Sequence, residues 1–156
     1  MAVIAALAGA GCRALASRMT LNLTASVPRG LYWLRPGSPL SRGTTVYLPF
    51  PPSVRSLIAT RRYLPSSFRL LKRVVAVAGD HVCTEDDLYV VGDTIISAIA
   101  THDHVGRPLE PYHFCGAVPP GYVFLAARGE SSLDSRYFGP VAIGDLTAAV
   151  PIWTSF

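Results

Sequence analysis

The sequence predicts an all-β domain, mainly strands with one or two short helices, on the basis of three observations. Its 156 residues fit a single domain, since domains typically span about 100–200 residues. Half of the residues are hydrophobic and only 15% are charged, which supplies a core and excludes an intrinsically disordered chain. Thirteen glycines and thirteen prolines favour many turns and argue against a helical bundle.

The N-terminal residues form a separate segment. Residues 1–12 carry no charge and are mostly small or aliphatic, and Arg13 and Arg18 follow them. A helix that crosses a bilayer needs roughly 20 apolar residues, and a secretory signal carries positive charge before its apolar run. We interpret residues 1–19 as a short apolar segment, a truncated membrane anchor with a misplaced start codon. The alternative is a short amphipathic or frayed helix. Residues 20–156 are then the folded domain.

Segments rich in β-branched and aromatic residues, bounded by proline and glycine, predict the strands. These segments are residues 30–34, 44–48, 69–78, 88–91, 122–126 and 146–153. A short helix is expected at residues 54–59, with Ser53 as its N-cap. Gly79-Asp80 and Gly92-Asp93 are turn signals, and the second of them closes a hairpin. Residues 100–120 show no periodicity and are expected to be a loop or an inserted excursion.

Lys72 is the only lysine among fourteen basic residues, the other thirteen being arginine. The arginines are scattered along the chain, so a net charge of +4 is weak evidence for nucleic acid, and no nucleic-acid partner is expected. Lys72 stands inside the apolar run 69–78 and, on a strand, would share a face with Leu70 and Val74. Burial disfavours the ammonium form and can lower a lysine pKa by up to about 3–5 units. A neutral amine at this position could act as a base.

Three further segments combine reactive and conformationally restricted residues. They read Ser-x-Pro-x-Gly-x-Tyr at 26–32, Lys-Arg-Val-x-Ala-x-x-Gly-Asp at 72–80 and Ser-x-Asp-Ser-Arg-Tyr-x-Gly-Pro-Val at 132–141. A serine hydroxyl is a poor nucleophile without a base beside it. Ser26 precedes Pro28, which restricts the backbone, and Lys72 can supply the base in a Ser-Lys hydrolase site. The alternative is a serine in an ordinary turn and a lysine that snorkels from a strand end.

In their order along the chain, these segments resemble the type I signal peptidase superfamily, specifically the TraF branch of conjugative-transfer peptidases. The resemblance covers residues 20–156 and implies a signal-peptidase-like, LexA-like β fold with a small loop-rich insertion at roughly 81–120. It implies a serine endopeptidase that uses no cofactor, with Ser26 as the nucleophile and Lys72 as the general base.

The resemblance also implies supporting roles for other residues. The backbone N–H of the nucleophile and the hydroxyl of Thr24 would hold the oxyanion. Ser132 matches the family serine that orients the lysine amine. Asp134 and Arg136 match an acidic–basic pair of the last segment. The aspartate is thought to matter for activity in the TraF branch and looks more structural in general signal peptidases, so both roles for Asp134 stay open.

The partners implied are a precursor protein and the bacterial inner membrane. General signal peptidases place two residues between the nucleophile and proline, whereas Ser26 and Pro28 are separated by one, as in the TraF branch. The large second domain of the general enzymes is also lacking. Both departures favour a dedicated substrate, a conjugative pilin or mating-pair protein with an Ala-x-Ala-like site. The substrate would be cleaved on the periplasmic side and bound along a strand edge.

Several alternatives to this function remain open. In some family members an amine resolves the acyl-enzyme and gives a cyclic pilin, and the sequence allows both hydrolysis and this transfer. A general type I signal peptidase is the alternative within the hydrolases. A catalytically silent assembly module of the conjugation apparatus is the alternative from another class. A self-cleaving repressor is disfavoured, because no DNA-binding helix pair precedes the domain.

The cysteines and histidines offer either a disulfide or a metal site. A disulfide between Cys83 and Cys115 would close the insertion of a periplasmic domain, and Cys12 would stay unpaired. The two cysteines could alternatively bind zinc together with histidines. The chain has no Cys-x-x-Cys and no ordered His pair, so no metal site is expected. The histidines weighed for this role are His81, His102, His104 and His113.

Overall fold

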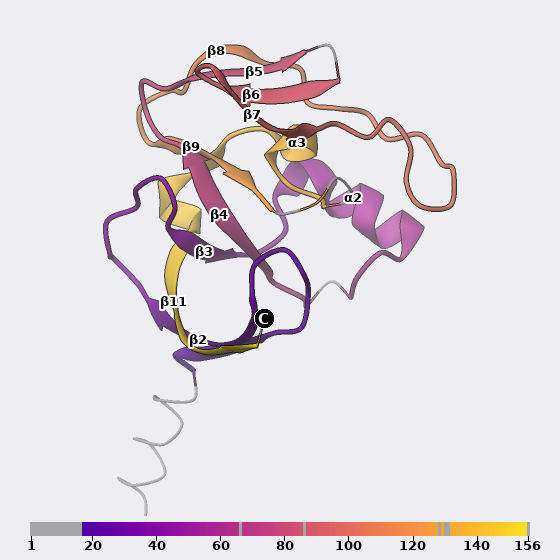
Figure 1. Ribbon diagram of the computed structural model, residues 1–156. Coiled ribbons are helices and arrows are strands. Elements are labelled where there is room, and N and C mark those ends of the chain that lie inside the picture. Colours follow the sequence, from indigo (N-terminus) through magenta and orange to yellow (C-terminus); the bar gives the residue numbers. More distant parts are fainter. Residues whose placement is uncertain (1–16, 66, 86, 128, 130–131, 156) are drawn as a thin grey trace, which may run out of the picture.

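The computed structural model describes residues 17–65, 67–85, 87–127, 129 and 132–155, and it is mainly β, as predicted (Figure 1). The anchor expected at residues 1–19 lies outside the described residues for all but its last three positions. Within the described ranges, no helix is both long enough and apolar enough to span a membrane.

A seven-stranded antiparallel sheet forms the body of the domain. Its order is β1 (Met19–Asn22), β2 (Arg29–Arg35), β11 (Thr147–Ser155), β3 (Thr45–Leu48), β4 (Leu70–Ala76), β9 (Tyr122–Ala126) and β10 (Val141–Ala142). The five strands predicted within these ranges are confirmed to within a few residues. The long β11 pairs with β2 on one side and with β3 on the other, so the C-terminal strand lies in the interior of the sheet.

A helix, α2 (Pro52–Arg61), covers one face of this sheet, and two shorter helices follow later, α3 (Ser135–Phe138) and η1 (Ile143–Asp145). Val54 and Ile58 of α2 are buried in the main core with the strands. The prediction of Ser53 as N-cap is wrong, because the helix begins at Pro52 and Pro51 occupies the cap position without a side-chain hydrogen bond. The proline ring fixes a helical φ and needs no N–H partner in the first turn, so it starts the helix earlier.

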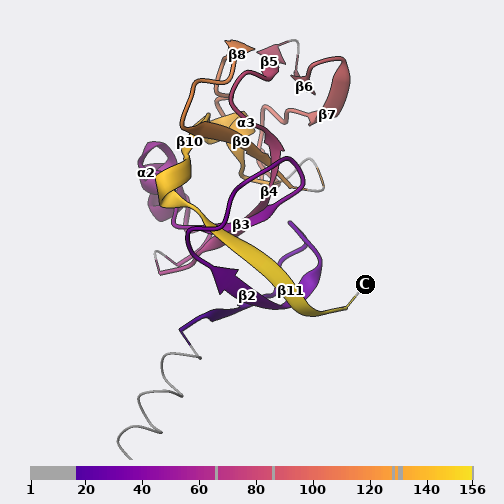
Figure 2. The same cartoon turned by 90° about the vertical axis from the view of Figure 1, so that its left-hand side faces the viewer.

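A second, four-stranded sheet stacks beyond the first, at the top in Figures 1 and 2. Its order is β7 (Thr94–Ala98), β6 (Leu88–Val91), β5 (His81–Glu85) and β8 (Cys115–Ala117). The hairpin predicted at Gly92-Asp93 joins β6 to β7 and is confirmed. The insertion is therefore a sheet of its own, although a loop-rich segment was expected. The strands β5 and β8 escaped prediction because polar residues and a glycine interrupt their apolar pattern.

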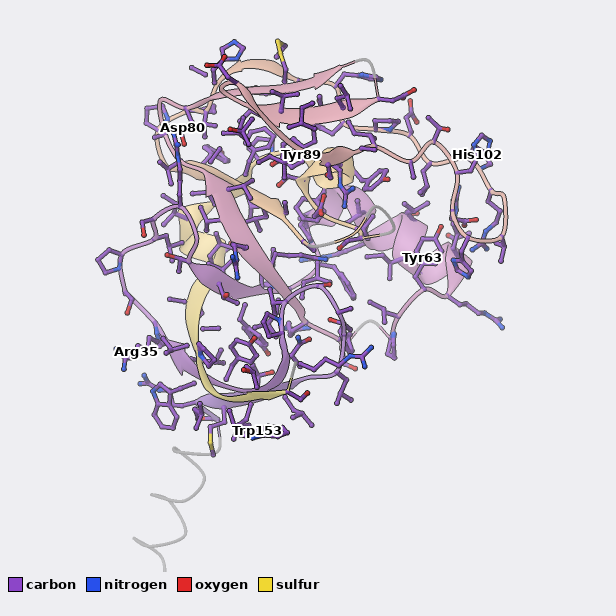
Figure 3. The ribbon with its side chains drawn as sticks, in the orientation of Figure 1. Arg35, Tyr63, Asp80, Tyr89, His102 and Trp153 are labelled. Atoms are coloured by element: carbon purple, nitrogen blue, oxygen red, sulfur yellow. A yellow bond between two sulfur atoms is a disulfide. The ribbon has the colours of Figure 1, made fainter. Side chains whose placement is uncertain are left out.

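The two sheets share a core. Tyr89 and Val82 of the small sheet are buried against Phe124 of β9, and Tyr89 lies between the two layers in Figure 3. At the turn between the sheets, the carboxylate of Asp80 accepts the Val77 N–H and pairs with Arg42. The Gly-Asp end of the second motif thus fixes the turn that connects β4 to the first strand of the small sheet.

The structure joins Cys83 of β5 to Cys115 of β8 by a disulfide across directly paired residues. The bridge spans 32 residues, for which the chain-entropy model gives about 3–4 kcal/mol of stabilisation. We expect non-reducing peptide mapping of protein exported to the periplasm to show this linked pair and a free Cys12. Free thiols at both positions, or stoichiometric zinc, would contradict the prediction.

Candidate active site

Three separate parts of the chain bring Ser26, Lys72 and Ser132 into contact. Ser26 lies in the loop between β1 and β2, Lys72 lies on β4, and Ser132 precedes α3. The Lys72 Nζ atom is 3.1 Å from the Ser26 Oγ atom and 2.5 Å from the Ser132 Oγ atom. The reactive residues of the three motifs therefore form one cluster.

Lys72 is buried, with 2% of its surface exposed. Burial lowers its pKa from 10.5 to about 8, while the negative charge of Asp134 raises this pKa and the positive charge of Arg136 lowers it. No ion pair to Lys72 is found in the described part of the chain. An amine that is desolvated and lacks a carboxylate partner loses its proton more readily than an exposed lysine, which suits it to accept the Ser26 proton.

A buried asparagine, Asn22, organises the loop that carries Ser26. Its Nδ2 donates to the carbonyls of Thr24, Val27 and Pro28 at 3.0, 3.0 and 3.1 Å. Its Oδ1 accepts the N–H of Thr24 at 3.2 Å. Sequence reasoning missed this residue. The available signal was an asparagine at a strand end before a proline turn, where its amide can satisfy local backbone groups.

Thr24 lies beside Ser26 on the wall of the same cavity. Its hydroxyl, expected to hold an oxyanion, donates to the Asn22 Oδ1 atom at 2.9 Å in this structure. The hydroxyl can reach an oxyanion only by exchanging that partner. Asn22 therefore controls both the shape of the loop and the direction of the Thr24 hydroxyl.

Two other residues of the first motif, Gly30 and Tyr32, shape the backbone around the nucleophile loop. The Tyr32 hydroxyl donates to the Pro28 carbonyl at 2.6 Å and so ties β2 to the nucleophile loop. Gly30 has a φ of +148°, and a Cβ there would lie 2.0 Å from the Trp153 carbonyl oxygen of β11. Only glycine allows β2 and β11 to approach this closely at the base of the loop.

Asp134 and Arg136 form a fully buried pair beneath the cluster, both 0% exposed. The guanidinium donates to both carboxylate oxygens, from Nε at 2.8 Å and from Nη2 at 2.9 Å. Asp134 also accepts the Ala127 N–H at the end of β9. Arg136 donates to the carbonyls of Ser132 and of Ala98 at the end of β7. The pair thus holds the backbone of Ser132 against both sheets, and no hydrogen bond joins Asp134 to Lys72 or Ser26 among the described residues.

Ser26 forms part of the wall of two cavities. One has a volume of about 470 Å³ and also contains Lys72 and Ser132 in its wall. The second has a volume of about 360 Å³. Its other lining residues are Val27, Pro28, Arg73, Val75, Ile96, Ala126, Ala127 and Gly129.

The group of potential metal ligands lies in the small sheet, apart from this cluster. His81, Cys83 and Cys115 come within 4.8 Å of one another, but the disulfide occupies both sulfur atoms. His102 and His104 line the larger cavity beside the serine cluster and do not pair with Ser26. The arrangement that can perform chemistry is therefore a serine hydroxyl with a buried amine beside it, which suits acyl transfer.

One family model and several known proteins are similar to this chain. A family model described as signal peptidase, peptidase S26, matches residues 1–154. The chain is 37% identical over 145 residues to a probable conjugal transfer protein TraF of Sinorhizobium fredii, covering 86% of this chain and 76% of that protein. It is 34% identical over 158 residues to the conjugal transfer protein TraF of Agrobacterium fabrum, covering 95% and 89%.

One solved structure is similar to the chain. The signal peptidase I of Enterococcus faecalis matches with a TM-score of 0.44 and 20% identity, covering 72% of this chain and 97% of that chain.

Proposed function

The chain belongs to the signal peptidase family, peptidase S26, and on that premise we propose that it is a serine endopeptidase with a Ser26–Lys72 dyad. The observation that carries the proposal is the 3.1 Å contact between the Ser26 hydroxyl and a buried amine that has no carboxylate partner among the residues that the structure describes. The pKa of that amine, about 8, supports a role as general base near neutral pH.

The first half of the reaction forms an acyl-enzyme. The neutral Lys72 amine takes the proton of the Ser26 hydroxyl as its oxygen attacks the scissile carbonyl carbon. The Thr24 hydroxyl gives up its hydrogen bond to the Asn22 Oδ1 atom. It then donates, together with the Ser26 backbone N–H, to the oxyanion of the tetrahedral intermediate. The C–N bond then breaks, and the Lys72 ammonium protonates the leaving amine. Ser132, 2.5 Å from the Lys72 amine, orients its lone pair toward Ser26.

The second half releases the product. A water molecule attacks the ester carbon, its proton passes to Lys72, and Lys72 returns a proton to the Ser26 oxygen as the ester bond breaks. If the amino terminus of the substrate attacks in place of water, the same steps give a cyclic peptide and leave the dyad in the same state. The dyad supports both outcomes.

The proposed substrate is a membrane-targeted precursor, a conjugative pilin or mating-pair protein with an Ala-x-Ala-type site. The names of the two relatives, which are conjugal transfer proteins, support a role in conjugation. The site would act at the periplasmic face of the inner membrane. The two cavities that include Ser26 in their walls support binding of an extended peptide.

The pKa of Lys72 gives a pH dependence with a defined sign. Because the neutral amine is the reactive form and its pKa is about 8, kcat/KM should rise with pH through about 8 and level off above it. The measurement is kcat/KM over the range from about pH 6 to about pH 10, with chemistry shown to be rate-limiting. A flat profile under those conditions would rule out a titrating lysine base.

The proposed function is tested with the precursor itself. The chain and a pilin precursor from the same transfer region are co-expressed, and the mass and N-terminus of the mature product are determined. Processing that depends on Ser26 supports the proposal, and a product lighter by one water than the linear mature chain indicates cyclisation. Mating that survives Ser26→Ala unchanged indicates an assembly module. Accumulation of many secretory preproteins after depletion indicates a general signal peptidase.

A further inference from the structure

The larger cavity beside the dyad is lined mainly by apolar side chains. Its volume of about 470 Å³ falls within the range of about 300–1,000 Å³ that is typical of ligand pockets. The methyl group of an alanine would leave most of this lining in contact with water. The apolar part of the wall includes Ile58, Leu64, Phe68, Leu70, Leu109 and Leu133.

One wall of this cavity comes from the segment that connects β7 to β8. Residues 100–109, which follow β7, pass beside the end of α2, on the side where Figure 3 labels His102 and Tyr63. The Asp103 carboxylate accepts hydrogen bonds from the Tyr63 hydroxyl at 2.6 Å and from Arg107 Nε at 2.7 Å. It also accepts from Arg61 Nη1 of α2 at 3.5 Å. Asp103 therefore fastens this segment to the helix and fixes the wall.

We propose that this cavity is a specificity pocket for one bulky apolar side chain, of leucine or phenylalanine size, within three residues of the scissile bond. The inference rests on the proposed function and narrows its substrate class. The Ser26 and Lys72 side chains form part of the pocket wall, so the occupant must lie close to the bond that is cleaved. The apolar lining favours a hydrophobic side chain, since burying apolar surface is favourable and burying an unpaired polar group is costly.

The test uses a precursor with an Ala-Ser-Ala cleavage site. The three residues before and the three residues after the scissile bond are each set in turn to Ala, Leu and Phe. At one of these positions, Leu or Phe should raise kcat/KM over Ala by about 10-fold or more, because a filled apolar pocket discriminates by roughly that factor per methylene. Ala preferred at all six positions, in a reaction that depends on Ser26, would overturn the pocket and leave the proposed function standing.

A variant that fills the pocket tests whether the preference for Leu or Phe arises in this cavity. Leu109→Trp adds bulk to the wall and should remove the preference, so that precursors with Ala, Leu or Phe at the selected position are cleaved with similar kcat/KM. Ile95→Trp is the matched control, since Ile95 is exposed on β7 and does not line either cavity. If Leu109→Trp fails to fold, Leu64→Phe serves the same purpose. An unchanged preference in a folded wall variant would contradict the proposal.

A binding measurement separates this inference from catalysis. Fluorescent peptides spanning the cleavage site, with Ala or Phe at the selected position, are titrated into the Ser26→Ala protein. The Phe peptide should bind about 10-fold more tightly. Equal affinities would overturn the pocket. Persistence of precursor cleavage in the Ser26→Ala protein would instead overturn the proposed function, and the peptide affinities would still decide the pocket.

Discussion

Replacing either Ser26 or Lys72 by alanine should abolish precursor processing without unfolding the protein. Loss of a nucleophile or its base in serine hydrolases costs on the order of 10⁴–10⁶-fold in kcat. Lys72→Arg should be equally inactive, because a guanidinium stays protonated and cannot accept the Ser26 proton. The measurement is the single-turnover rate of each purified variant on the precursor, with circular dichroism melts to verify folding.

The matched control for Lys72→Arg removes a basic residue just before the same strand. Arg69 is exposed beside β4, and its guanidinium donates only to the nearby carbonyls of Ser67 and Phe68 within the described chain. Arg69→Ala should therefore process the precursor at the parent rate. Normal cleavage by either Lys72 variant would end the dyad hypothesis.

Asp134→Asn should impair both stability and activity. The substitution leaves a fully buried Arg136 without a charged partner, and breaking one side of a buried pair costs about 3–5 kcal/mol. For a domain of this size, that corresponds to a decrease in Tm on the order of 10 °C. Activity should decrease as well, because Arg136 holds the backbone of Ser132, which contacts the Lys72 amine.

Ser132→Ala separates the two effects. It removes the hydroxyl beside the amine and leaves the buried pair intact, so kcat should decrease with little change in KM or Tm. If Asp134→Asn abolishes activity without changing Tm, the aspartate acts directly in the reaction. If Asp134→Asn lowers Tm alone, the aspartate is a structural residue and leaves the list of site residues.

Five of the seven strands of the large sheet could be predicted because their side chains carry the signal locally. Residues 69–78, for example, form an apolar run that ends at a glycine turn. The dyad could be predicted because Ser26 and Lys72 each stand in a recognisable motif. The roles assigned to them stay predictions, and the structure adds that the two side chains are in contact.

The features that escaped prediction depend on contacts distant in sequence or on backbone geometry. Asn22 has no motif of its own, and its importance appears only when the chain folds back so that its amide meets the Val27 and Pro28 carbonyls. The strand β8 has three residues and forms because β5 is available to pair with it. The cavity wall that Asp103 holds in place depends on its hydrogen bond with Tyr63, which follows α2 and is 40 residues away in sequence.

The burial of Lys72 also links the folding equilibrium to the binding of protons. The unfolded chain keeps a lysine pKa near 10.5, and the folded protein holds it at about 8. Between these pH values the unfolded state binds more protons, so the free energy of unfolding rises as pH increases. The full difference is about 3–4 kcal/mol, at about 1.4 kcal/mol for each pKa unit. Below about pH 8 the folded protein holds a charged amine in its interior, and its free energy of unfolding is lower by that amount. The burial that lets Lys72 lose its proton therefore makes the fold less stable.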